Sequence, residues 1–83
     1  SMRCSPNPAN DKIEISWIQK VTSSNSFSLV DLQGKSVKEV ETKELSAGKN
    51  AMEWNLSEVP AGVYMLLRSD AKQSEHTRII VLH

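Results

Sequence analysis

Apolar and polar residues alternate along most of this chain. Ile13, Ile15 and Trp17 are separated by polar residues, and Phe27 and Leu29 follow the same rule. A period of two is that of a β-strand with one buried face and one solvated face. Turn residues recur at intervals of roughly eight to twelve positions, the spacing of short strands in all-β domains. The pattern therefore predicts an all-β protein.

Two segments are apolar on both faces, residues 63–67 and residues 79–82. The first is typical of a strand in the middle of a sheet. The second is either a central strand or an edge that a partner covers. Val37 and Val40 are oddly spaced, which indicates a bulge or an edge strand. The expected strands are 3–5, 13–17, 26–29, 35–42, 52–56, 63–67 and 76–82, with a loop at 45–50.

We therefore predict a seven-stranded antiparallel immunoglobulin-like β-sandwich, because seven short strands with alternating faces are typical of that class. The expected core consists of Ile15, Trp17, Phe27, Leu29, Trp54, Leu56, Tyr64, Leu66, Ile79 and Val81.

The composition limits the chain to one small domain. It has 83 residues, 39% of them hydrophobic, with a net charge of +0 and a pI of about 6.7. This charge excludes the basic stripe that binds nucleic acid, and no apolar stretch approaches the length of a membrane span. Ser1 and Met2 look like the remnant of an affinity tag. We expect residues 3–83 to be a single domain at the tail of a larger protein.

The sequence contains no recognisable set of catalytic residues. His76 and His83 are the only histidines, and neither has a carboxylate at a defined spacing. Cys4 is the only cysteine, so there is no internal disulfide and no structural zinc spacing. No nucleophile motif and no glycine-rich phosphate loop occurs. We expect no enzyme, no cofactor, no metal and no small-molecule substrate.

Three turn signals stand out in order along the chain. Pro6 and Pro8 fix two φ angles in Pro-Asn-Pro-Ala, which predicts an extended segment before the first long strand. Asp31 and Gly34 occupy the first and fourth positions of a turn, as a hairpin closed by a type I turn requires.

The third signal is a corner before the strand at 63–67. Pro60 presets φ and Gly62 relieves the backbone, so that Tyr64 can bury its ring and return its hydroxyl to a corner carbonyl. This arrangement is similar to the tyrosine corner of immunoglobulin-like sandwiches.

Taken together, the order and spacing of these signals resemble the C-terminal sorting domain of cargo proteins of the bacterial type IX secretion system, over nearly the whole chain. The resemblance implies a signal that takes a passenger from the periplasm across the outer membrane, to the cell surface or the medium. It implies the type IX translocon as partner, and a sortase-like surface peptidase as a second one. The partner-binding residues that it suggests are Pro60, Gly62, Tyr64, Arg78, Ile80, Leu82 and His83.

The chain departs from the family pattern at both ends. His83 stands where the family usually has lysine or arginine, and no aromatic residue precedes Pro6. Cys4 is expected to fill part of the pocket of that missing aromatic.

Two other functions fit the same fold. One is a generic accessory or interaction module of a secreted surface protein. Sugar binding by such a module usually needs exposed aromatics, whereas aromatic content here is 5% and the rings fall on inward positions. The other is a homotypic module that pairs through residues 37–40 or through the terminal strand, so the expected state is a monomer or weak dimer.

Overall fold

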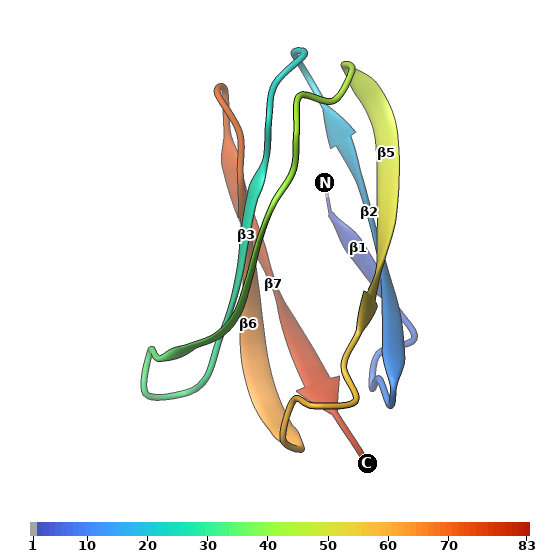
Figure 1. Ribbon diagram of the computed structural model, residues 1–83, viewed down its shortest axis with the longest axis vertical. Helices are drawn as coiled ribbons and strands as arrows, with labels where there is room; N and C mark the ends of the chain where they lie inside the picture. The colour runs from blue at the N-terminus through green and yellow to red at the C-terminus, as the bar shows by residue number, and fades with distance from the viewer. Residues whose placement is uncertain (1) are drawn as a thin grey trace.

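The computed structural model describes residues 2–83, which form two β-sheets facing each other and no helix (Figure 1). This confirms the predicted all-β sandwich of seven antiparallel strands. The strands are β1 (Arg3–Ser5), β2 (Lys12–Gln19), β3 (Ser26–Val30), β4 (Ser36–Glu41), β5 (Gly48–Asn55), β6 (Gly62–Ser69) and β7 (Ser74–Val81).

The sheets have the orders β1-β2-β5 and β4-β3-β6-β7. β4 pairs with β3, and their register shifts between Leu29 and Val30, so the predicted bulge and edge position of this strand are both confirmed. In a constant-type immunoglobulin domain the fourth strand joins the other sheet. The details of an immunoglobulin-like topology therefore stay a prediction. β6 lies between β3 and β7, as predicted for a strand in the middle of a sheet, and on its outward face Val63 and Met65 are half-buried while Leu67 is 39% exposed.

Several strand boundaries differ from the sequence expectation, and the largest difference is at the start of β5. Residues 45–50 were expected to form a loop, but β5 already begins at Gly48, which lies opposite Gln19 of β2. The reason is that β2 extends to Gln19, so its partner strand gains paired residues at that end.

All ten predicted core residues are buried. The centre of the core is aromatic: the Phe27 ring centroid lies 5.1 Å from that of Trp17 and 5.9 Å from that of Trp54, both in edge-to-face geometry. Met2, Ala9, Ile13 and Val59 complete the buried set.

A buried polar network closes the upper end of the sandwich in Figure 1, and the sequence analysis did not foresee it. Arg68 follows Tyr64 and Leu66 on the inward face of β6 and is only 1% exposed. Its guanidinium lies 2.7 Å from Asp70 and 2.6 Å from Glu75. These ion pairs neutralise a charge that would otherwise be costly to bury.

Neutral side chains extend the same network. Arg68 donates to the side-chain oxygen Oδ1 of Asn25 at 2.6 Å, and the Asn25 side chain donates to Oε1 of Gln19 at 2.8 Å. Trp17 Nε1 also donates to Gln19, at 3.0 Å. The side chains of this network are therefore hydrogen-bonded to one another, as most buried polar groups are.

The β3–β4 hairpin closes as predicted. The Gly34 amide donates to the Asp31 carbonyl at 3.0 Å, and Gly34 has a φ of 84°. The Asp31 carboxylate accepts from the amides of Gln33 and Lys35, both at 2.9 Å. Asp31 and Gly34 thus have the turn roles that the sequence assigned to them.

Candidate recognition surface

The corner before β6 is built around the Tyr64 hydroxyl, which donates to the carbonyl oxygen of Pro60. The Tyr64 ring is 5% exposed and packs in the core. This confirms the predicted tyrosine corner. Gly62 has a φ of 159°, and a Cβ there would sit in ordinary contact with the Tyr64 ring at 3.7 Å. A side chain would therefore fit beside the ring, and glycine is favoured here by its backbone conformation.

β7 is an edge strand, so the alternative of a central strand does not apply within residues 2–83. Ile79 and Val81 point into the core and are at most 1% exposed. Arg78 and Leu82 are exposed and Ile80 is half-buried, so these three side chains form the outward series of the tail.

The corner and the tail are in direct contact. Gly62 lies opposite Val81 in the β6–β7 pairing. Beyond the strand, His83 Nε2 lies 2.6 Å from the carbonyl oxygen of Val59. A carbonyl only accepts, so Nε2 carries a proton and donates. The terminal imidazole is thereby held to the corner loop.

Asn10 bonds to the other side of the His83 ring. With the Asn10 amide oriented so that its nitrogen faces the acceptors, that nitrogen donates to His83 Nδ1 at 3.2 Å and to the Leu82 carbonyl at 3.0 Å. The Asp11 carboxylate lies 3.7 Å from the same Nδ1. Residues near the start of the chain thus contact its end.

The Pro-Asn-Pro-Ala segment also lies along β7. Ala9 pairs with Val81 as a parallel bridge, its amide donating to Ile80 O at 2.8 Å and its carbonyl accepting from Leu82 N at 2.7 Å. Asn7 donates from its side chain to Arg78 O at 2.9 Å and accepts from Ile80 N at 3.1 Å. The prediction of an extended segment was wrong, because residues 6–8 form a bend, and only Ala9 pairs with β7, a partner that the sequence did not indicate. Both proline peptide bonds, Ser5–Pro6 and Asn7–Pro8, are cis.

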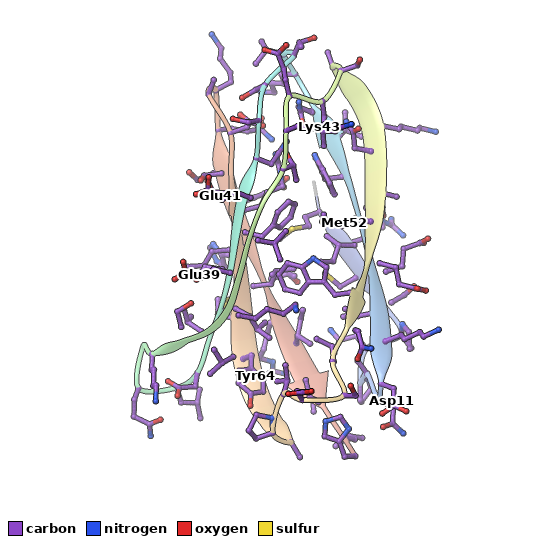
Figure 2. All side chains as sticks on the ribbon, viewed as in Figure 1. Asp11, Glu39, Glu41, Lys43, Met52 and Tyr64 are labelled. Carbon is purple, nitrogen blue, oxygen red and sulfur yellow. The ribbon has the colours of Figure 1, made fainter. Side chains whose placement is uncertain are left out.

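The first and third sequence signals therefore converge at one end of the sandwich, where the chain ends in Figure 1. Figure 2 shows Tyr64 and Asp11 at this end and Lys43 at the other. Among the expected partner-binding residues, Tyr64 has a buried ring. A partner therefore cannot contact this ring, although the ring supports the surface from below. We call this region the motif end and define it as residues 6–10, 59–62 and 78–83.

Sequence reasoning missed Asn7, Ala9, Asn10 and Val59 as members of the motif end. Their contacts with the tail are hydrogen bonds of main-chain groups, side-chain amides or the His83 ring. These bonds join residues far apart in sequence, as with the separation of 73 positions between Asn7 and Ile80. No periodicity reports such a contact. The only available signal was the proline pair, because prolines are often placed at sheet edges.

Cys4 is half-buried and packs against the core from β1, while its place in the pocket of a missing aromatic residue stays a prediction. Burial raises the pKa of its thiol from 9.0 to about 11. A thiol with such a pKa is a poor nucleophile at neutral pH. Across residues 2–83, no three His, Cys, Asp or Glu side chains are grouped so that they could hold a metal ion.

Fold and surface together define a small β-sandwich whose distinctive feature is a structured tail at one end. The chain belongs to the family of secretion system C-terminal sorting domains, which it matches over residues 4–82. Membership indicates a C-terminal sorting signal for type IX secretion, a non-catalytic kind of domain that interacts with the secretion machinery. It also implies export across the outer membrane.

No curated protein matches the chain. The part that the structure describes contains no helix with the length and apolar character needed to cross a bilayer.

Proposed function

We propose that this domain is recognised as a folded surface, the motif end, by a subunit of the type IX translocon. In this proposal the domain accompanies its passenger through the periplasm and directs it across the outer membrane. A sortase-like surface peptidase is its second partner. The observation that carries the proposal is the contact of His83 with Val59, since it joins the tail to the corner in one surface.

The residues of the motif end divide into two roles. Leu82 is 54% exposed, and with Pro60 and Arg78 it offers apolar and cationic contacts to a partner. Ile80 and His83 border the same surface. An exposed leucine and a cation in the same outward series suit a small interface with an apolar centre and a polar rim.

Gly62 and Tyr64 act indirectly. The Tyr64 hydroxyl fixes the Pro60 carbonyl, and Gly62 adopts the positive φ with which β6 begins. Because interfaces depend on preorganisation, these two residues set the pose of the corner that the partner contacts.

The test is a reporter fused in front of residues 3–83 and directed to the periplasm of a host with this secretion system. We expect the reporter at the cell surface or in the medium, measured by protease accessibility and by fractionation. Retention in the periplasm of a fusion whose sorting domain is folded would refute the proposal.

A matched pair of variants identifies the surface. Ile18 and Leu82 are both 54% exposed, but Ile18 lies in β2, outside the motif end. We expect Leu82→Ser to lower export and Ile18→Ser to leave it unchanged. Equal effects of the two variants would show that general surface hydrophobicity, and not the motif end, is read.

A further inference from the structure

The outer edge of β7 is partly covered by residues 6–10, which we call the strap. The strap supplies two hydrogen bonds through the Asn7 side chain and two through the Ala9 main chain. These bonds satisfy the outward groups Arg78 O, Ile80 N, Ile80 O and Leu82 N. Within residues 2–83, β7 has no second strand neighbour.

The strap covers the stretch of β7 that has the strongest tendency to pair with another strand. Residues 79–82 are Ile-Ile-Val-Leu, uncharged and β-branched at three of four positions. Uncharged segments of high β propensity, when left on an open edge, pair with other chains. The beginning of β7, residues 74–77, is Ser-Glu-His-Thr, which is polar and lacks this sequence signature.

The chemistry of the strap suits it to end a sheet. The Asn7 amide offers a donor and an acceptor in the same way as a peptide group, so it replaces one residue of a neighbouring strand. Pro6 and Pro8 have no N–H and cannot donate to a further strand. The strap therefore covers the edge of β7 and presents a poor edge of its own.

We propose that the strap is an edge guard for the sorting tail and that Asn7 is its positioning residue. This inference rests on the proposed function. With the strap in place, the outward backbone groups of Ile80 are occupied, and a partner reads the tail through the side chains of Arg78, Ile80 and Leu82. Without Asn7, the same edge pairs with a second copy of the domain, and the pose that the translocon reads is lost.

The first test is amide hydrogen exchange in the 83-residue chain. Asn7→Ala removes the acceptor of the Ile80 amide, and we expect that amide to exchange at least tenfold faster. Leu66, in the central strand β6, serves as the internal reference and should not change. Asn7→Asp keeps the acceptor but loses the donor to Arg78 O, so the Ile80 amide should stay protected. Fast exchange at Ile80 in both variants, or in neither, would overturn the role of Asn7.

The second test is sedimentation over a range of concentrations. We expect Asn7→Ala to associate at concentrations where the parent chain does not. The matched control is Asn50→Ala, since the Asn50 amide also donates to main-chain carbonyls, those of Ser46 and Gly48. Equal association of the two variants, or none in either, would rule out the edge guard.

The third test is export of the reporter fusion. We expect Asn7→Ala to be exported at least fivefold less than Asn50→Ala. If the two are exported equally while the parent fusion reaches the surface, the proposed function stands and the positioning role of Asn7 fails. If the parent fusion itself stays in the periplasm, the proposed function fails, and the exchange and sedimentation results still decide whether the strap guards the edge.

Discussion

His83 donates from Nε2 to the carbonyl oxygen of Val59 over 2.6 Å, so the last residue of the chain is bonded to the loop that precedes β6. This bond closes a ring of contacts in which the corner, the tail and the strap support one another. Under the proposed function, the sorting signal is therefore a three-dimensional surface. Its integrity can be separated from its recognition only by variants that leave the core intact.

Two C-terminal truncations of different length separate the stability of the fold from recognition of the tail. Removing residues 79–83 deletes the core side chains Ile79 and Val81, and each such loss costs about 2–5 kcal/mol of unfolding free energy, enough to unfold a small domain. Removing only residues 82–83 loses the Leu82–Ala9 and His83–Val59 bonds, about 2 kcal/mol in total. We expect the shorter truncation to remain folded in circular dichroism melts and to lose export.

The parent fusion is the positive control for export, and the fusion lacking residues 79–83 is the unfolded negative control. Normal export of the folded two-residue truncation would place the recognised signal away from Leu82 and His83.

The hydroxyl of Tyr64 should contribute measurably to stability. Tyr64→Phe keeps the buried ring but removes the bond to the Pro60 carbonyl, and we expect the unfolding free energy to fall by about 1 kcal/mol. Urea melts of the two proteins measure the difference. An unchanged midpoint would mean that the corner is held without this bond.

Gly34→Ala is the control for stability alone. Gly34 has a φ of 84°, where a Cβ costs about 1 kcal/mol, and there is open space around it. It lies in the β3–β4 turn, away from the motif end. If both variants lose similar stability but only Tyr64→Phe loses export, the corner has a role in recognition as well as in folding.

Most of the sandwich could be predicted from alternation because burial has the period of the strand. Ile13, Ile15 and Trp17 are inward, and the polar residues between them are not. The hairpin at Asp31 and the corner at Tyr64 were also predictable, since each depends on residues within a few positions of one another.

What alternation could not give were interactions that depend on a distant partner. Arg68 shares the inward face with Leu66, and its burial needs Asn25, 43 positions away, besides its acidic neighbours. The charge of an arginine predicts an exposed side chain, but the ion pairs of Arg68 compensate for its burial. The strap is a second case, because nothing in Asn7 itself identifies β7 as its partner.

The thiol of Cys4 should react slowly in the folded chain. Because burial raises the pKa of Cys4 from 9.0 to about 11, the thiolate fraction at pH 8 is roughly a hundredfold smaller than that of an ordinary thiol. We expect iodoacetamide to alkylate the native protein about a hundredfold more slowly than the urea-unfolded chain, measured by mass spectrometry. Similar rates in the two states would contradict the packing of β1 against the core.

Asp70 should make the stability of the domain fall in acid. Burial raises the pKa of Asp70, but the hydrogen bond from Arg68, the amides of two residues in the following turn and the charge of Arg68 outweigh it. The pKa of Asp70 in the folded chain is therefore below its ordinary value of 3.8. A carboxyl with a lowered pKa stabilises the fold above its ordinary pKa, and this contribution is lost as the pH falls through the folded value.

We expect the urea midpoint of the parent chain to fall on acidification below about pH 4, the region set by the ordinary pKa of an aspartate. Asp70→Asn should be less stable at pH 7 and should show a shallower decline in acid, because its amide does not titrate. Asp11→Asn is the control, since the Asp11 side chain is 73% exposed. Its acid profile should run parallel to that of the parent chain. A parallel profile for Asp70→Asn as well would show that the Arg68–Asp70 pair does not control acid stability.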